Sequence, residues 1–169
     1  MNCPLCGFDN IEGVDECARC RTDLGDLCSP EERRTDLERD LLRDPLGAVA
    51  GDDFVEVRAA DRLGDVVRRM AEGGQHCAIV VEDAAPVGIV TERDILNRVA
   101  DRFEAIADSP VGDHMTPNPE SRRWDDPVAF GLNGMMVGGY RHIPLEREGG
   151  LAGVVSVRDV LGYLVERIG

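Results

Sequence analysis

The stretch Gly88-Ile-Val-Thr-Glu-Arg-Asp94 decides how this chain folds, because the chain repeats it as Gly153-Val-Val-Ser-Val-Arg-Asp159. Both copies contain a glycine, two aliphatic β-branched residues, a hydroxyl residue, and an Asp three positions after the hydroxyl. An aliphatic pair follows each Asp, Ile95-Leu96 in the first copy and Val160-Leu161 in the second. An apolar run that meets a hydroxyl residue at the start of a helical pattern predicts a strand-to-helix junction.

The first junction lies in a regular pattern of predicted elements. We expect a strand at 54–57, a helix ending at Gly73-Gly74, strands at 76–81 and 86–90, and a helix from Glu92. Helical spacing predicts that the inward faces of the two helices consist of Leu63, Val66, Val67, Met70 and Ala71, and of Ile95, Leu96, Val99 and Phe103.

The second junction lies in the same pattern. A helix ends at Gly138-Gly139, strands follow at 140–145 and 151–155, and a final helix ends the chain. The predicted inward residues are Val128, Leu132, Met135 and Met136, and then Val160, Leu161, Leu164, Val165 and Ile168. We align Met70 with Met136 and His76 with His142, with one residue lost in the second strand–strand turn. Each copy is too small to bury its core alone, so the two should pack together.

Composition narrows the function. The net charge of −14 and an aromatic content of 4% disfavour nucleic-acid binding, which needs clustered cations and stacking platforms. All 19 basic residues are Arg, so Schiff-base chemistry and phosphate loops ending in Gly-Lys are excluded. No nucleophile–base motif is recognised, and we expect no enzyme. No signal peptide or membrane span is evident, and we expect a cytoplasmic protein.

Four cysteines near the N-terminus form two Cys-x-x-Cys pairs, Cys3 with Cys6 and Cys17 with Cys20. This spacing favours a closed, structural Zn²⁺ site, with a rubredoxin-like iron site or two disulfides as alternatives. The segment resembles short zinc ribbons from Cys3 to Leu24, although Arg21 stands where the second knuckle usually carries Gly. The segment carries five carboxylates and only two Arg residues. This acidic balance favours a structural or protein-contact role over nucleic-acid binding.

Four domains are predicted: a ribbon at 1–25, a connector helix and linker at 26–50, a first unit at 51–108 and a second unit at 109–169. The connector helix should begin at Ser29-Pro30-Glu31-Glu32, which has the form of a capping box, and should end at Asp44-Pro45. We interpret it as a charged connector, with partner binding as the alternative.

The paired units resemble a tandem of cystathionine β-synthase (CBS) domains, a Bateman module, over roughly Phe54 to Gly169. The doubled junction, the Arg141-His-Ile-Pro144 sequence and the Val111-to-Pro117 stretch carry the resemblance. It implies an α/β (α+β) fold of two βαββα units with pseudo-twofold symmetry. It also implies binding of adenosine-containing ligands between the units, disc-like homodimers and a regulatory role.

The junction residues have two interpretations. Thr91, Asp94, Ser156 and Asp159 cap helices, and the carboxylates also suit the two hydroxyls of a ribose. Arg141, His142 and Arg158 are candidates for binding phosphate; the alternatives are a surface ion pair for Arg141 and a packed strand histidine for His142. Ile143 and Pro144 are candidates for an adenine slot, which Ile79, Ile89 and Val154 could also form. Core packing is the alternative for all of these apolar residues. The unit that carries Arg141 looks better suited to a phosphorylated ligand.

We therefore expect a sensor of AMP, ADP, ATP or S-adenosylmethionine whose zinc ribbon contacts an unidentified protein partner or orders the dimer. The alternatives are a scaffolding dimer with vestigial clefts and a nucleic-acid-associated ribbon factor.

Overall fold

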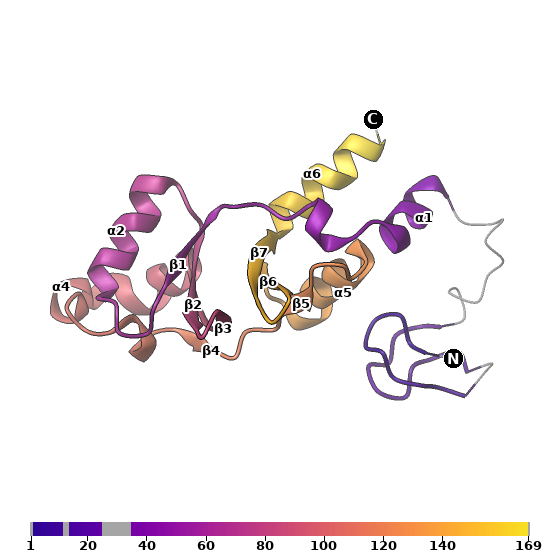
Figure 1. Cartoon of the computed structure of the whole chain (residues 1–169), viewed down its shortest axis with the longest axis horizontal. Helices are drawn as coiled ribbons and strands as arrows, with labels where there is room; N and C mark the ends of the chain where they lie inside the picture. Colours follow the sequence, from indigo (N-terminus) through magenta and orange to yellow (C-terminus); the bar gives the residue numbers. More distant parts are fainter. Residues whose placement is uncertain (1, 12–13, 25–34, 169) are drawn as a thin grey trace.

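The computed structural model describes residues 2–11, 14–24 and 35–168, and it places the two junctions in two similar units (Figure 1). One unit contains a four-stranded sheet of order β1-β2-β3-β4, and the other a three-stranded sheet of order β5-β6-β7. Helices accompany both sheets. This mixed α/β architecture confirms the predicted fold class.

The first unit has the predicted order up to its junction. β1 (Phe54–Val57) is followed by α2 (Leu63–Gly73) and by the hairpin of β2 (Cys77–Glu82) and β3 (Ala85–Thr91). β1 pairs in parallel with β2, and β3 pairs antiparallel with both β2 and β4 (Thr116–Pro117). Gly74 caps α2 with a φ of 67°, as the double glycine predicted.

The helix after β3 is less regular than predicted. It consists of α3 (Glu92–Asp94), a π-helical turn η4 (Ile95–Val99), a 3-10 turn η5 (Ala100–Arg102) and α4 (Phe103–Ile106). Val99 in this segment is buried, whereas Leu96 is 71% exposed. The prediction that Leu96 faces inward is wrong.

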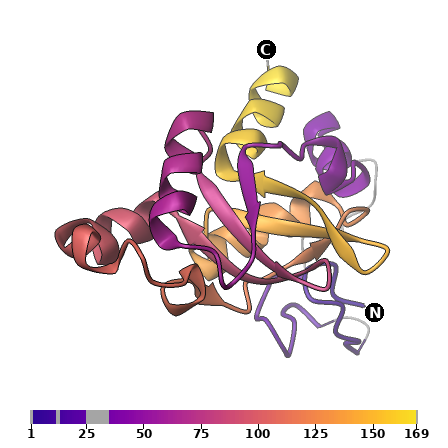
Figure 2. The ribbon, with the colours of Figure 1, turned by 60° about the vertical axis from the view of Figure 1, so that its left-hand side comes forward.

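The second unit repeats this arrangement. β5 (Arg122–Arg123), α5 (Val128–Gly138), β6 (His142–Arg147), β7 (Gly150–Ser156) and α6 (Val157–Ile168) follow one another. β5 is parallel to β6, and β6 is antiparallel to β7. The two hairpins meet where β3 lies beside β7, and Leu151 N donates to Ala84 O at 2.8 Å (Figure 2).

The repeat keeps one constant offset of 65 residues, which corrects the predicted alignment. Cys77 pairs with Thr91 in the first hairpin, and His142 pairs with Ser156 in the second. His142 is therefore the counterpart of Cys77, and Arg141 is the counterpart of His76. The turns have equal length, so the predicted deletion is absent, and the counterpart of Met70 is Met135.

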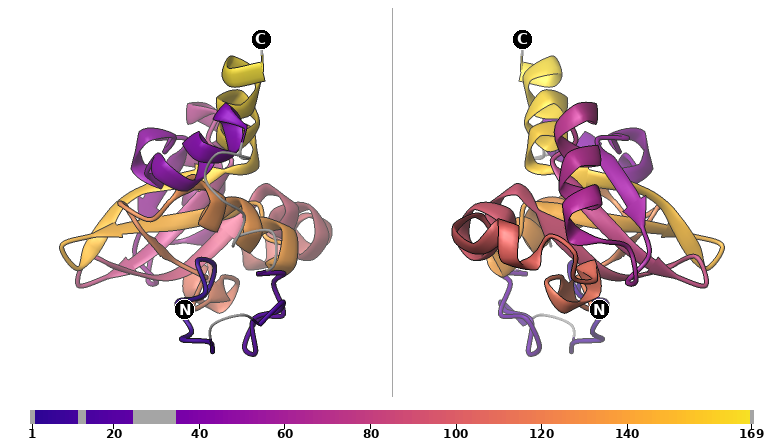
Figure 3. Two further views of the ribbon diagram at one scale, coloured as in Figure 1. Left: turned by 90° about the vertical axis from the view of Figure 1, so that its right-hand side faces the viewer. Right: turned by 90° about the vertical axis from the view of Figure 1, so that its left-hand side faces the viewer.

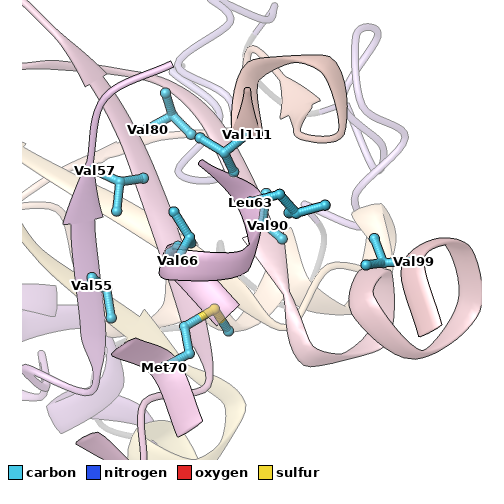
Figure 4. Close-up of a cluster of buried hydrophobic side chains, with 10 residues drawn as sticks. Val55, Val57, Leu63, Val66, Met70, Val80, Val90, Val99 and Val111 are labelled. Carbon is cyan, nitrogen blue, oxygen red and sulfur yellow. The ribbon is translucent and has the colours of Figure 1, made fainter. Parts of the chain in front are cut away.

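The segment before each unit packs against the other unit. The 3-10 turn η3 (Leu46–Ala48) puts Leu46 in the core of the second unit, and Gly51 N donates to Val154 O at 3.0 Å. Its counterpart η6 (Val111–Asp113) puts Val111 in the core of the first unit (Figure 4). The two units are thereby linked twice, by segments that cross between them.

Three buried clusters hold the pair together. The first core collects Val55, Val57, Leu63, Val66, Met70, Ala78, Val80, Val90, Val99 and Val111. The second collects Leu46, Met135, Ile143, Leu145, Val155 and Val160. A third joins the units through Cys77, Ile79, Ile89 and Val154.

Several residues predicted to face inward are exposed instead. Met136 on α5 is 75% exposed, and Leu161, Val165 and Ile168 on α6 are 54%, 69% and 71% exposed. The C-terminal turns of α6 project beyond the rest of the chain (Figure 3). Ala71 is also exposed. These helices have an inner stripe narrower than the periodicity suggested, and an outer apolar stripe without a cover in the described chain.

The connector contains α1 (Asp36–Arg43), which packs against α5 and α6. Thr35 caps it in a box with Glu38, and the helix ends at Asp44 as predicted. The predicted start at Ser29–Glu32 lies outside the described residues. At the other end, Asp44 accepts hydrogen bonds from Tyr163 Oη at 3.0 Å and from Arg167 Nη2 at 2.8 Å, which fastens α6 to the connector.

Candidate functional site

Both junctions are capping boxes with nearly identical geometry. Asp94 Oδ2 accepts from Thr91 N at 2.9 Å and from Thr91 Oγ1 at 2.7 Å. Asp159 Oδ2 accepts from Ser156 N at 2.6 Å and from Ser156 Oγ at 2.7 Å. The capping interpretation is confirmed. Because each carboxylate uses one oxygen for its cap, its other oxygen decides whether it can also bind a ligand.

The neighbours of that other oxygen differ between the two copies. Asp94 Oδ1 is bound by Arg98 Nη2, and Arg98 also donates to Thr116 Oγ1 at 3.2 Å. The residue equivalent to Arg98 in the second copy is Tyr163, whose hydroxyl is directed to Asp44. Asp159 Oδ1 instead lies against the backbone of Gly51, where an added Cβ would be 3.2 Å away.

An open cleft of about 330 Å³ lies beside the first junction and extends to the second unit. The first unit contributes the residues around Thr91 and Asp94, and the second contributes the turn between α5 and β6. The full lining is His76, Ile89, Thr91, Glu92, Arg93, Asp94, Thr116, Asn118, Pro119, Glu120, Gly139, Tyr140, Arg141 and His142. A cavity of this size lies at the lower end of the range for small-molecule sites.

The equivalent space beside the second junction is almost closed. It has a volume of about 10 Å³ and is lined by Gly51, Asp53, His76, His142, Val154, Ser156 and Asp159. With the offset of 65, these positions correspond to those of the open cleft: Gly51 to Thr116, Asp53 to Asn118 and Val154 to Ile89. The described residues therefore form two equivalent clefts, and of these two only the cleft beside the first junction has room for a ligand.

Contacts across the two units accompany this closure. His76 lines both clefts, its Nδ1 lies 3.0 Å from Glu92 Oε1, and its Nε2 contacts the guanidinium of Arg158. Glu92 begins the helix at the first junction and Arg158 lies in the first turn of α6. The imidazole thus joins the two helix starts.

His142 also lines both clefts. Burial, and then the neighbouring His76, lower the pKa of His142 below its ordinary value. Its Nδ1 is buried and makes no hydrogen bond with the described residues. A neutral His142 is therefore favoured at neutral pH, and a ligand at this wall would meet an uncharged imidazole.

The structure brings together some of the predicted ligand residues and separates others. Thr91, Asp94, Arg141 and His142 line the open cleft, whereas Ser156 and Asp159 line the closed one. The predicted adenine slot needs correction, because Ile143 and Pro144 are buried and line neither cleft.

The predicted phosphate-binding role of Arg158 also needs correction, because its side chain contacts His76 and lines neither cleft. Sequence reasoning missed Thr116, Asn118, Glu120 and Tyr140, which line the open cleft. The stretch Met115-Thr116-Pro117 lies 65 residues after Ala50-Gly51-Asp52, and this repeat offset is the sequence signal that could have identified Thr116 as a cleft residue.

The four predicted zinc ligands also lie together. The Sγ atoms of Cys3, Cys6, Cys17 and Cys20 all lie within 4.8 Å of one another. The Sγ atoms of Cys3 and Cys20 lie 3.6 Å apart, as do those of Cys6 and Cys17. A tetrahedron of thiolates with Zn–S bonds near 2.3 Å has S–S edges of about 3.8 Å, so the arrangement fits the ion.

The backbone around these thiols has the form of two matched knuckles. Gly7 N donates to Cys3 O at 2.9 Å, and Arg21 N donates to Cys17 O at 2.9 Å. Gly7 has the expected positive φ of 68°, and Arg21 adopts a φ of 56° where glycine is usual. Asn10 is buried between the knuckles, and its Oδ1 accepts from Ala18 N at 2.9 Å.

Comparison with known proteins gives consistent matches. The family model for the CBS domain matches residues 46–101 and 125–166, together more than half of the chain. A CBS domain-containing protein of Arabidopsis thaliana is 30% identical over 162 residues, which cover 94% of this chain and 29% of that protein. The chain spans between 19% and 63% of the length of the curated relatives that it matches.

Solved structures match the paired units. A CBS domain protein from Pyrobaculum aerophilum, complexed with AMP, is 26% identical with a TM-score of 0.63, covering 72% of this chain and 96% of that one. A CBS domain pair in complex with 5′-methylthioadenosine and S-adenosyl-L-methionine has a TM-score of 0.64 at 15% identity, covering 73% and 97%. The second likeness is one of fold alone.

In the part of the chain that the structure describes, no helix is both long and apolar enough to cross a membrane.

Proposed function

This chain belongs to the CBS-domain family, and we propose that its paired units form a regulatory module that binds an adenosyl compound in the open cleft beside Thr91 and Asp94. The observation that carries the proposal is this cleft of about 330 Å³, which is lined both by the junction carboxylate of Asp94 and by Arg141 of the other unit. The AMP complex of the Pyrobaculum relative supports adenosine as the ligand class.

The residues of the cleft can be assigned to parts of such a ligand. Asp94 would accept hydrogen bonds from the ribose hydroxyls, after exchanging Arg98 for the ligand. Ile89 is the apolar wall for the base, in place of the predicted Ile143 and Pro144. Thr91 and Arg141 would face the phosphate or other tail group. The nearly closed second cleft fits a vestigial site. The vestigial clefts of the scaffolding alternative would then be limited to this one cleft.

A thermal-shift panel of AMP, ADP, ATP and S-adenosylmethionine tests this function. Ligand at a hundredfold excess over its dissociation constant stabilises the folded state by about 2.7 kcal/mol. For a chain of this size, that corresponds to a rise in melting temperature of about 5–10 °C. Flat curves with all four compounds at millimolar concentration would contradict the proposal.

We also propose that Cys3, Cys6, Cys17 and Cys20 hold a structural Zn²⁺. The buried Cys3, Cys17 and Leu24 are the only apolar core residues described in the ribbon, so the ion would supply most of its stability. The site has four protein ligands and no open position, which suits structure and not catalysis. The ribbon would then be the part that contacts a protein partner.

Homodimerisation is the last component of the proposal. The apolar stripe formed by Met136, Val137, Leu161, Val165 and Ile168 on α5 and α6 is exposed. A groove of about 400 Å³ between α2 and η4, lined by Val67, Ala71 and Leu96 among others, lies at the equivalent place on the first unit. Exposed apolar surface of this kind marks interaction sites, and a second copy of this chain would cover both.

A further inference from the structure

The two clefts occupy equivalent positions, but the charged groups that line them differ. Arg141 at the open cleft is replaced by His76 at the closed one, and Asn118 is replaced by Asp53. The hydroxyl and the Asp of the junction are common to both. The side chain beside the Asp also differs, because Arg98 pairs with Asp94 where the second copy has Tyr163.

Two carboxylates of the open cleft are paired with arginines within the chain, Asp94 with Arg98 and Glu120 with Arg122 at 2.6 Å. A third, Glu92, lies 3.0 Å from Nδ1 of His76, which is charged only when it is protonated. Two guanidinium groups of the same cleft have no such partner. Among the described residues, neither Arg93 nor Arg141 has a side-chain hydrogen bond or ion pair.

The closed cleft shows the reverse pattern. Its two carboxylates, Asp53 and Asp159, make no ion pair with the described residues, and no Arg lines it. Arg158, the counterpart of Arg93, is directed to His76 instead. An anion brought here would meet two carboxylates without an arginine partner, whereas at the open cleft it would meet two unpaired guanidinium groups and one such carboxylate, Glu92.

We infer that this chain distinguishes its two clefts by charge, so that it binds one adenosine compound with an anionic tail in the open cleft and excludes that compound from the other. This inference rests on the proposed function and narrows it. The tail would be a phosphate held by Arg93 and Arg141, since a guanidinium matches phosphate oxygens with paired N–H donors. A sulfonium compound such as S-adenosylmethionine lacks the group that these side chains favour.

Isothermal titration of the full zinc-loaded chain with AMP, adenosine and S-adenosylmethionine tests the inference. We expect AMP to bind with a stoichiometry of one, and both other compounds to bind about tenfold or more weakly. Arg93→Gln and Arg141→Gln should each weaken AMP about tenfold and leave adenosine unchanged. Both side chains are exposed, so these variants should fold, and their melting temperatures check this.

Arg147→Gln is the matched control. Arg147 ends the strand that Arg141 precedes, it is exposed, and it lines neither cleft. Arg147→Gln changes the net charge by the same amount as Arg93→Gln or Arg141→Gln, and it should leave the affinity for AMP unaltered.

The possible failures separate the inference from the function on which it rests. Adenosine binding as tightly as AMP, or two AMP molecules per chain, would overturn the charge assignment and leave adenosyl binding intact. Arg147→Gln weakening AMP as much as Arg141→Gln would also overturn it, because the effect would then belong to the overall charge. The absence of binding by all three compounds would overturn the proposed function itself.

Discussion

Replacing each junction acid by its isosteric amide separates helix capping from ligand binding. Asp94→Asn and Asp159→Asn are chemically the same change, at two positions with the same capping hydrogen bonds. Asp94 lines the open cleft and Asp159 the nearly closed one. Each variant is therefore the internal control for the other.

The two variants should lose similar amounts of stability. Loss of a negative charge in the first helical turn costs about 0.3–1 kcal/mol. Asp94 also loses its pairing with Arg98, whose side chain is 48% exposed. Screening by solvent limits such a pair to about 0.2–1 kcal/mol. We expect the free energy of unfolding to fall by about 1 kcal/mol in both variants, and slightly more in Asp94→Asn.

Their effects on ligand affinity should differ strongly. In Asp94, Oδ2 serves the cap and Oδ1 is left to accept from the ribose hydroxyls, whereas an amide has one acceptor oxygen and can serve only the cap or the ribose. Losing one charge-assisted hydrogen bond costs about 1.5–3 kcal/mol, which is about 10- to 100-fold in affinity. Asp94→Asn should therefore weaken AMP by this factor, and Asp159→Asn by less than about twofold, as for a change remote from the site.

Urea unfolding gives the stabilities, and titration calorimetry with AMP gives the affinities on the same samples. Equal losses of affinity in both variants would refute the assignment of the ligand to one cleft. An Asp94→Asn variant that binds AMP like the parent chain would reduce the junction to a helix cap.

Three further predictions concern the ribbon, the connector and the apolar helices. Native mass spectrometry should find one zinc per chain, and Cys17→Ser should lose the metal and unfold the ribbon while AMP binding persists, because the clefts lie outside the ribbon. Burial raises the pKa of Asp44, but hydrogen bonds from Tyr163, Arg43 and Arg167 outweigh it and hold the pKa below 3.8. Because the pKa of Asp44 is depressed in the folded state, the stability that its hydrogen bonds contribute is fully present above about pH 4. This stability is lost as the pH falls through the pKa of the folded state. The difference in unfolding free energy between the parent chain and Asp44→Asn should therefore shrink on acidification from pH 5 to pH 2. If the proposed dimer forms through this stripe, the parent chain should be dimeric in light scattering and Leu161→Glu monomeric, with an unchanged circular dichroism spectrum; a monomeric parent chain would contradict the proposed interface.

Local chemistry made the junctions and helix ends predictable from the sequence. The hydroxyl and Asp spacing fixes a capping box within four residues, and a double glycine fixes the left-handed cap at Gly74 and Gly139. The cysteine pairs likewise specify a cluster through their spacing alone. These features need no information from distant parts of the chain.

The internal alignment failed for a physical reason. Matching Met70 with Met136 and His76 with His142 relied on residue identity, whereas the strand pairing follows the hairpin register. The constant offset of 65 also pairs Leu46 with Val111, and each of these residues packs in the opposite unit. An exchange of segments between units changes no local pattern, so periodicity carries no sign of it.

The asymmetry of the clefts depends on contacts between residues far apart in sequence. Arg158 meets His76 across 82 positions, and Asp44 holds Tyr163 away from the second junction across 119. The residues that differ between the copies, such as Arg98 and Tyr163, are visible in the sequence, but the distant partner that each side chain reaches is not. Similarly, Leu96 and its counterpart Leu161 are both exposed, although helical spacing predicted that both face inward.

A crystal structure of the chain grown with AMP tests the central claim most directly. We predict density for one nucleotide in the cleft between Thr91 and Arg141, with its ribose hydroxyls on Asp94 and its phosphate at Arg93 and Arg141. Density beside Asp159 instead, or an unchanged cleft at saturating AMP, would contradict the account.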